Sequence, residues 1–584
     1  MKRLNPIWWI VLIVALGAVN FIASKLHSRF DLTREKRYSL TKTTKDLVRQ
    51  LNNEIVVNTY LKGDFPTEFR KLATATQEFL SVLKESNPSK IRYHFIDPQD
   101  EVFSGKTWAD SLRQLGVDPI NLTVQVKAGQ ENKMVFPYAI INYQGQQSLV
   151  NLFQSSKRNI SVAELNNAEA MMEYQFASKI ERMLYPEKPL IAYSAGNGEP
   201  ASVDVFALRH AIDPESINYA ALPDEVREKF PPARSNYLLN LVNLRTLPFI
   251  PDTFKVLLIV KPSLQFSDSE KLKIDQYVMH GGKVLWFIDN LHAEQDSLSI
   301  KSQLIAYDRN LNLEDLLFNY GIRINLDLIM DLQCDFLPFA VGGSPSNPQF
   351  EFLHWNYYPL FESRNNHVIN KNLGLVAGHF VNSIDTVGGK EVKKTILLQS
   401  SVNSRTIGTP AVISPNENRN APEDALFKQH DIPAAILVEG RFNSLYRSRI
   451  AQSQIDTLRK YGGFLRQTED ENKMIVVADG DVVLNDVSPK TGPLPMGTNI
   501  FTVGSQYEYQ FANRDFLLNC LEYLTSKGNI LKTRNKEIVL RLLDSKKVQS
   551  EKVKWQIINI ALPVLIVILF GYLYQQIRRR KFAS

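Results

Sequence analysis

Carboxylate and amide side chains follow three apolar segments of the chain, at the points where those segments end. Asn197 and Glu199 come after LIAYSA, Asp289 follows KVLWFI, and Asp479 and Asp481 follow KMIVVA. Ligands of open α/β sheets bind at the carboxyl ends of the strands. The pattern therefore predicts a crevice where these five residues bind a cation or a polar solute. Gly, Asn and Asp also serve backbone geometry in turns, and that interpretation stays open beside the first.

The sequence contains no arrangement of residues typical of an enzyme site. The nine histidines form no His-Glu-x-x-His motif and no pair with metal-ligand spacing. Gly-Asn-Gly-Glu at 196–199 is neither a Walker A loop nor Gly-x-Gly-x-x-Gly. Cys334 has no evident basic neighbour, so we expect a buried structural thiol. We predict no catalytic residue, no metal, no cofactor and no enzyme activity.

The segments that carry the polar residues alternate with helical patterns. Ser267 and Glu270 have the spacing of a capping box, and Gly281 and Gly282 end the helix that it opens. Near-continuous apolar strands that alternate with helices indicate a mostly parallel sheet covered on both faces. Residues 187–485 are therefore predicted to form an α/β domain of Rossmann-like or flavodoxin-like type.

The region before this domain has its own order of elements. A strand at 54–61, a helix at 65–85 and a strand at 90–98 form a β-α-β unit. Further elements follow it: a helix at 108–115, strands at 121–126 and 138–143, and a helix at 162–184. This order is typical of a thioredoxin-like fold. No cysteine precedes Cys334, so disulfide exchange on that scaffold is excluded.

Each end of the chain has an uncharged, largely apolar segment. Residues 4–24 and 555–577 are long enough to cross a bilayer as helices. Basic residues flank both outer ends, which predicts that both termini are cytoplasmic and that the large folded part is periplasmic. The alternative for the first segment is a cleaved signal peptide. The prediction is therefore an inner-membrane protein with two spans.

The second segment has features that a plain anchor does not need. Pro563 removes a hydrogen-bond donor within the helix, and Asn559 lies one turn earlier on the same face. Gly571 allows close approach of another helix. These three residues predict a surface that docks on a permease, and the alternative is that they are tolerated near the interface.

Composition and order together predict a globular protein with two spans. With 44% hydrophobic residues and a net charge of +7 spread along the chain, neither disorder nor nucleic-acid binding is indicated. The predicted parts are a cytoplasmic start with span 1 (1–24), a linker with a short helix (25–53), a thioredoxin-like domain (54–186), the α/β domain (187–485), a C-terminal helical segment and linker (486–553), span 2 (554–577) and a basic tail (578–584).

Several segments, in order along nearly the whole chain, resemble the GldG family, which comprises gliding-motility accessory proteins of ABC transporters in Bacteroidetes. They are RYSLTKTTKDLV, TYLKGDFPTEFRKL, KLKIDQYVMHGGKVLWFID, VADGDVVLND, NRDFLLNCLEYL, LRLLDSKKV and WQIINIALPVL. The resemblance implies a periplasmic substrate-binding subunit of unknown ligand, paired with a multi-pass permease and, through it, a cytoplasmic ATPase. It also implies a link to gliding and surface-protein secretion.

The resemblance leaves two main hypotheses open. The first is an accessory, substrate-binding subunit of an ABC transporter, and the second is a structural coupling protein of the envelope that binds no small ligand. Related auxiliary proteins resemble this chain at SAGNGEP but carry Gly-His-Gly-Glu, where this sequence has Asn197. That difference argues against metal or proton chemistry at the turn.

Overall fold

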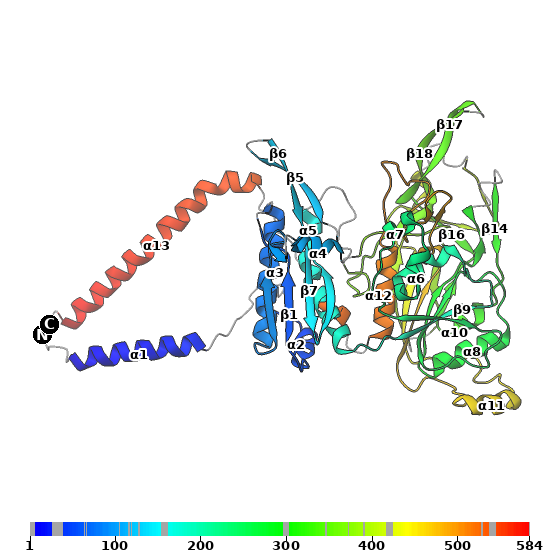
Figure 1. Ribbon diagram of the computed structural model, residues 1–584, viewed down its shortest axis with the longest axis horizontal. Coiled ribbons are helices and arrows are strands. Elements are labelled where there is room, and N and C mark those ends of the chain that lie inside the picture. Colours follow the sequence, from blue (N-terminus) through cyan, green and yellow to red (C-terminus); the bar gives the residue numbers. More distant parts are fainter. Residues whose placement is uncertain are drawn as a thin grey trace. The chain divides into compact units, whose positions relative to one another are not determined.

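The computed structural model describes residues 6–25, 39–63, 65, 67–103, 106–114, 117, 119–126, 129–153, 162–295, 303–344, 347–371, 373–388, 392–415, 424–526, 530–535 and 545–582. The chain divides into two units, Met1–Lys536 and Glu537–Ser584. Residues 26–38 of the predicted linker and 536–544 before the second span lie outside the described residues. The fold is mixed α/β (Figure 1).

A four-stranded sheet forms the first part of the larger unit. Its strands follow the order β2-β1-β7-β8, in which β1 and β2 are parallel and the other pairs are antiparallel. Helix α3 joins the parallel pair, because parallel strands need a long crossover connection. The elements of this part are α2 (Lys42–Arg49), β1 (Ile55–Thr59), α3 (Thr67–Ser86), β2 (Ile91–Phe95), β7 (Tyr138–Tyr143), β8 (Gln146–Asn151) and α5 (Val162–Leu184).

The thioredoxin-like order needs the strand predicted at 121–126 to pair with the strand at 138–143. The structure does not contain this pair. β5 (Ile120–Val126) instead pairs with β6 (Gly129–Val135) in a separate two-stranded hairpin. Strand β7 lies between β1 and β8, and the sequence of β8, QQSLVN, is too polar to predict a strand. The thioredoxin-like assignment therefore stays a prediction that rests on the sheet order alone.

A seven-stranded sheet forms the second part. The order is β10-β9-β11-β12-β25-β24-β21; its first four pairs are parallel and its last two antiparallel. The bounds are β9 (Leu190–Ala195), β10 (Leu238–Asn243), β11 (Phe254–Val260), β12 (Lys283–Phe287), β21 (Val392–Gln399), β24 (Pro433–Gly440) and β25 (Asn472–Val477). The predicted mostly parallel sheet is present, and β24 and β21 add antiparallel strands at one side of it.

Both faces of this sheet are buried, as the near-continuous apolar runs predict. Leu258 and Phe287 face a core shared with α6 (Phe206–Ile212) and α12 (Asn513–Thr525). Leu257 and Trp286 face a second core, shared with α8 (Asp268–Met279) and α10 (Glu314–Asn319). Each fully buried side chain of this size contributes about 1.5–3 kcal/mol. The sheet whose strand ends carry the predicted site residues is therefore packed against a hydrophobic core on each face.

The predicted capping box at the start of α8 is confirmed. Ser267 Oγ accepts a hydrogen bond from Glu270 N at 3.3 Å, and the Glu270 carboxylate accepts one from Ser267 N at 2.8 Å. Gly281, with φ +87°, follows the end of the helix. Cys334 and Cys520 are both buried and free, as expected for structural thiols.

The remaining elements are short or belong to small sheets inserted between β12 and β24. They are β3 (Glu101–Phe103), β4 (Lys106–Thr107), α4 (Trp108–Gln114), η1 (Val203–Val205), η2 (Pro214–Ser216), η3 (Tyr219–Ala221), α7 (Asp224–Lys229), β13 (Leu291–His292), β14 (Leu304–Asp308), β15 (Ile322–Ile324), β16 (Asp327–Asp331), β17 (Cys334–Ser344), β18 (Asn347–Phe361), β19 (Val376–Ala377), β20 (Ile384–Thr386), β22 (Ser404–Gly408), β23 (Ala411–Ile413), η5 (Asp424–Leu426), α11 (Gln452–Leu458), η6 (Arg459–Tyr461), η7 (Asp481–Val483), β26 (Val487–Ser488), β27 (Gly492–Pro493) and η8 (Ile530–Asn535).

Helix α5 joins segments that are far apart in the sequence of the larger unit. The buried carboxylate of Glu173 accepts hydrogen bonds from Thr41 N, Thr41 Oγ1 and Thr44 Oγ1 at 2.8, 2.7 and 2.6 Å. The hydroxyl of the next residue, Tyr174, donates to Glu522 of α12, and the guanidinium of Arg534 lies 5.0 Å from its ring. Two adjacent residues of α5 thus hold the start of α2, α12 and η8.

The same helix predicts a pH dependence of stability. Burial and the neighbouring Glu522 raise the pKa of Glu181 to about 7 from a usual value of 4.5, although Arg182 opposes the shift. A raised folded-state pKa contributes stability that is complete below pH 4.5 and is lost as the pH rises to 7. The thermal midpoint of wild type relative to Glu181→Gln should therefore fall across this window and level off above it. Glu187→Gln, at an exposed position, serves as the control. An unchanged difference in thermal midpoint between wild type and Glu181→Gln from pH 4.5 to 8 would contradict the raised pKa of Glu181.

The smaller unit consists of helix α13 (Ser545–Phe582), which contains Pro563. Among the described residues, it is the one helix that is long and apolar enough to cross a membrane, over Ser550–Arg580. This finding is consistent with membrane anchoring. The described apolar part of α1 (Pro6–Lys25) is Val11–Asn20, which is shorter. The N-terminal span and the periplasmic orientation therefore stay predictions.

Candidate functional site

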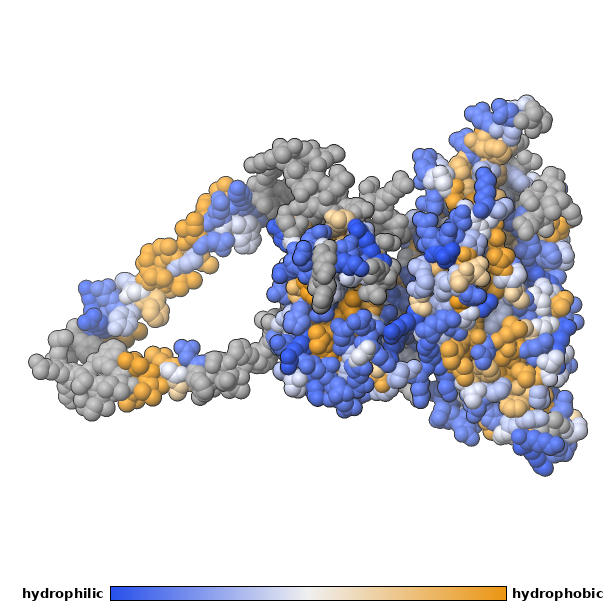
Figure 2. All heavy atoms as spheres, in the orientation of Figure 1, coloured by the Kyte–Doolittle hydropathy of each residue, from blue (hydrophilic) through white to orange (hydrophobic). Residues whose placement is uncertain are grey.

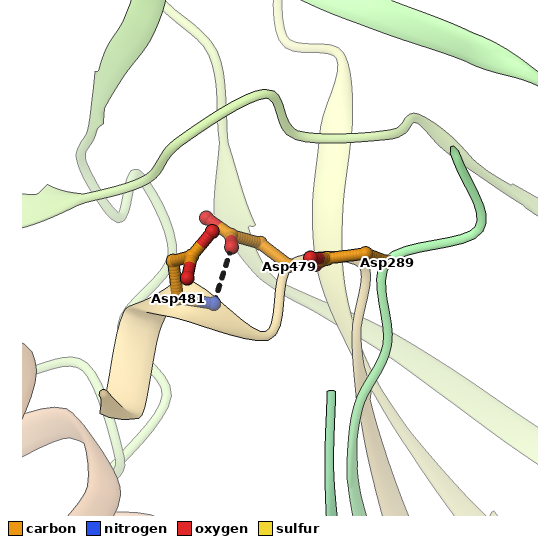
Figure 3. A group of neighbouring side chains, drawn as sticks. All are labelled: Asp289, Asp479 and Asp481. Carbon is orange, nitrogen blue, oxygen red and sulfur yellow. Dashed lines mark hydrogen bonds between the residues drawn. The ribbon is translucent and has the colours of Figure 1, made fainter. Parts of the chain in front are cut away.

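Three of the predicted site residues converge at the carboxyl edge of the seven-stranded sheet. Asp289 follows β12, and Asp479 and Asp481 follow the neighbouring parallel strand β25. Each of the three carboxylates offers an oxygen atom, and these atoms lie within 4.8 Å of one another (Figure 3). Parallel strands end at the same edge of a sheet, which is why residues 190 positions apart in the sequence meet.

The side chain of Lys261, at the end of the adjacent strand β11, lies among these carboxylates. Its Nζ donates to both oxygens of Asp481 at 2.6 and 2.8 Å and to Glu294 at 3.0 Å, and it lies 3.4 Å from Asp289. The guanidinium of Arg309 pairs with Glu294 and lies 3.8 Å from Asp289. We call Lys261, Asp289, Glu294, Arg309, Asp479 and Asp481 the strand-end charge centre.

The sequence does not single out the two cations of this centre. Lys261 directly follows an apolar strand, as the aspartates do. A lysine at such a position is, however, expected to be an ordinary surface residue. Its backbone has φ +44°, which is uncommon for a residue other than glycine. Glu294 and Arg309 come from the region between β12 and β24, which has no periodicity that predicts their position.

Burial and mutual charge set the protonation of the centre. Burial raises the pKa of Asp479 well above its usual range, and the charges of Asp481 and Asp289 raise it further. Burial also raises the pKa of Asp289, to about 6, against the opposing effect of Lys261. For Asp481 burial raises the pKa, but the nearby Lys261, His379 and Arg309 together outweigh it and lower the pKa. Lys261 and Arg309 therefore lie beside the carboxylates of this centre, and Asp479 is the carboxyl group whose charged form is least favoured.

A segment between β19 and β20 packs against Asp479 of the centre. His379 N donates to Asp479 Oδ2 at 2.8 Å, and the His379 ring stacks on Tyr358 with centroids 3.9 Å apart. Asn382 donates from its backbone N to Ala478 O at 3.0 Å and accepts from Asn290 N at 2.8 Å. A Cβ on Gly378 would lie 2.8 Å from Asp479 Oδ2. The convergent carboxylates are thus packed and paired within the protein.

Asn197 and Glu199 lie in a separate turn after β9. The Asn197 carbonyl accepts from Ser263 N and Leu264 N at 2.9 and 2.8 Å. The Glu199 carboxylate accepts from Ser194 Oγ and from Asn197 N, both at 2.7 Å. These bonds give the two residues a role in shaping the turn, as the backbone interpretation predicts. Ligand binding by any of the five residues stays a prediction.

The donor set of the centre fits a paired lysine better than a metal ion. A divalent cation at Asp289, Asp479 and Asp481 would need oxygens that Lys261 Nζ already contacts. The ammonium of Lys261 and the guanidinium of Arg309 would also repel it at this range in a buried site. The arrangement is therefore a buried ion-pair network.

The turn after β9 predicts a large cost for a methyl group at Gly198. Its φ is +76°, and a Cβ would lie 2.1 Å from Ser263 Oγ. Gly504 has φ +77° with nothing within 4 Å of its Cβ, so Gly504→Ala carries only the backbone cost of about 1 kcal/mol. We expect Gly198→Ala to lower the free energy of unfolding by about 2–4 kcal/mol, measured by denaturant unfolding. Equal losses in the two variants would contradict the contact.

The charge centre predicts strong coupling between Lys261 and Asp481. Lys261→Met leaves Asp481 without its paired ammonium, while Arg309 stays beside Asp289 and Glu294, and should cost about 3–5 kcal/mol of unfolding free energy. Adding Asp481→Asn should recover part of that loss, because it removes one of the unpaired charges. A double-mutant cycle on the exposed pair Arg323–Asp385, 57% and 49% exposed, should give a coupling below about 1 kcal/mol. Equal coupling in both cycles would show that the centre is not buried as described.

Comparison with known proteins identifies the family. Residues 188–520, which include the seven-stranded sheet and the charge centre, match the family described as an ABC-type uncharacterized transport system. The chain belongs to this auxiliary family of ABC transport systems. Residues 34–142 match a domain of unknown function. The family supports an accessory role in an ABC transport system, together with other transporter components, and the assignment to GldG stays a prediction.

One relative is similar over nearly the whole chain. An uncharacterized protein of Borreliella burgdorferi is 19% identical over 568 residues, which cover 95% of this chain and 94% of that protein. Solved structures are less similar. The mmIFT52 N-terminal domain has a TM-score of 0.27 and 11% identity, covering 58% of this chain and 97% of its own. A ThuA-like protein from Bacteroides uniformis has a TM-score of 0.25 and 13% identity, covering 60% and 98%. Scores this low carry no argument.

Proposed function

We propose that this chain is a membrane-anchored accessory subunit that docks on a multi-pass ABC permease through helix α13, with a separate cytoplasmic ATPase supplying energy. The observation that carries the proposal is the composition of α13 in a chain of this family. The helix is apolar and long enough to span a bilayer, yet it contains Asn559 and Pro563 one turn apart. A polar amide and a lost backbone donor in hydrocarbon need a neighbouring helix.

The chain needs partners to take part in transport. Its sequence has no P-loop, so ATP hydrolysis must come from another subunit. Its predicted spans are too few to line a multi-pass pathway. We infer that the large part between them is periplasmic and has no enzymatic activity, and that it acts by contact. The resemblance to GldG proteins suggests gliding motility and surface-protein secretion as the process.

The fold supports a scaffold of two sheets for this role. The order β2-β1-β7-β8 is compatible with a thioredoxin-like domain without redox cysteines. The parallel strands of the larger sheet, covered by helices on both faces, are compatible with a Rossmann-like domain.

A second candidate is structural coupling without a small ligand. The specific observation that favours it is the pairing of Lys261 with Asp481 and Glu294 under the segment that carries His379. A substrate-binding crevice at the same edge would have to displace these contacts. Substrate binding at the strand ends therefore requires these contacts to be replaced, whereas coupling does not.

The test of docking is the loss of copurifying permease when the face of α13 is changed. Replacing 555–577 by a leucine-alanine span should preserve insertion and abolish copurification in mild detergent. Asn559→Leu should weaken association by about 0.6–2 kcal/mol. The matched control Asn559→Leu/Ile558→Asn keeps the composition but turns the amide by about 100°, and it should not restore association. Undiminished copurification with the generic span would favour simple anchoring.

A further inference from the structure

Helix α13 continues past its apolar stretch into a turn that carries consecutive arginines. The apolar residues end at Ile577, shortly after Tyr572 and Tyr574, and Arg578, Arg579 and Arg580 follow within the same helix. All three arginines are exposed. Figure 2 shows the hydrophobic middle of α13 in orange and hydrophilic residues in blue at both ends. If the stretch crosses a bilayer, these guanidinium groups lie at the depth of the lipid headgroups.

Guanidinium groups at this depth fit the phosphates of lipid headgroups. Arginine presents five donors in a planar fork and binds phosphate through paired hydrogen bonds, which an ammonium cannot do. Cations in the last turn of a helix are also favoured by the helix dipole. We propose that Arg579 and Arg580 form a binding surface for anionic phospholipid headgroups. This inference rests on the proposed function, because it requires α13 to span the membrane.

The position of each arginine around the helix separates lipid contacts from permease contacts. At about 100° per residue, Pro563 and Gly571 lie about 40° and 120° from Asn559, so the docking face is centred near 60°. Arg578 lies about 40° from that centre, whereas Arg579 and Arg580 lie about 140° and 120° away. In the transporter complex, Arg579 and Arg580 therefore face lipid and Arg578 faces the permease.

The test measures lipid selectivity of the full-length chain in vesicles. The protein is inserted in phosphatidylcholine bilayers with trace spin-labelled phosphatidylglycerol or spin-labelled phosphatidylcholine, and the fraction of motionally restricted label gives the relative association. We expect wild type to prefer phosphatidylglycerol and Arg579→Gln/Arg580→Gln to lose roughly fivefold per arginine at low salt. Arg579→Lys/Arg580→Lys should keep part of the preference, since the charge remains. Salt above physiological strength should weaken the preference.

Two controls keep the outcome interpretable. Arg459→Gln/Lys460→Gln removes two charges from η6, where Arg459 is 71% exposed, and should leave lipid selectivity unchanged. Arg578→Gln should reduce selectivity in the chain alone but not in the complex with its permease. Equal loss from Arg578→Gln and Arg579→Gln in the complex would overturn the assignment of faces.

The result that overturns the inference differs from the result that overturns the proposed function. Unchanged selectivity in Arg579→Gln/Arg580→Gln, with the protein still resistant to extraction by alkaline carbonate, rejects the lipid surface and leaves anchoring intact. Loss of permease copurification in the same variant would instead assign these arginines to an acidic protein surface. Release of wild type from vesicles by carbonate would reject the span itself.

Discussion

The packing at the carboxyl edge of the seven-stranded sheet depends on the burial of one ammonium group. Lys261 lies among the carboxylates of Asp289, Glu294 and Asp481 at the carboxyl edge of the sheet. Removing charges from water costs several kcal/mol per ion, which is recovered only when partners are close and well oriented. The neighbouring positions of β11, β12 and β25, and the insertion that supplies Glu294 and Arg309, satisfy this condition together.

The charge centre also explains how far the sequence could predict the site. The aspartates were predicted to meet because they end parallel strands, and Asp289, Asp479 and Asp481 do meet. Asn197 and Glu199 obey the same rule but turn back on their own loop, where Gly196 and Gly198 have positive φ. A strand-end residue therefore indicates an edge of the sheet, and its partners depend on the neighbouring strand and loops.

Parts without periodicity could not be predicted. β8 has a polar sequence, so the sheet partner of β7 was missed, and the pairing of β5 with β6 was not anticipated. Glu294, Arg309 and His379 belong to an insertion in which small sheets alternate with irregular segments. Glu294, Arg309 and His379 contact residues that are distant in the sequence, and secondary-structure propensity does not predict such contacts. By contrast, the start of α8 could be predicted, because its capping box involves two residues that are three positions apart in the sequence.

The ion pairs of the charge centre occupy the carboxylates that were predicted to bind a ligand. The carboxylates of Asp289 and Asp481 contact Lys261, so a solute that bound them would have to replace these contacts. In the larger unit, α5 links the start of α2 to α12 and η8 through the adjacent residues Glu173 and Tyr174. Helix α5 therefore connects the segment at Thr41, through side-chain hydrogen bonds, to the helix that packs on the seven-stranded sheet. These contacts of α5 are separate from the strand-end charge centre, because they involve Thr41, Glu522 and Arg534 and none of the six residues of the centre.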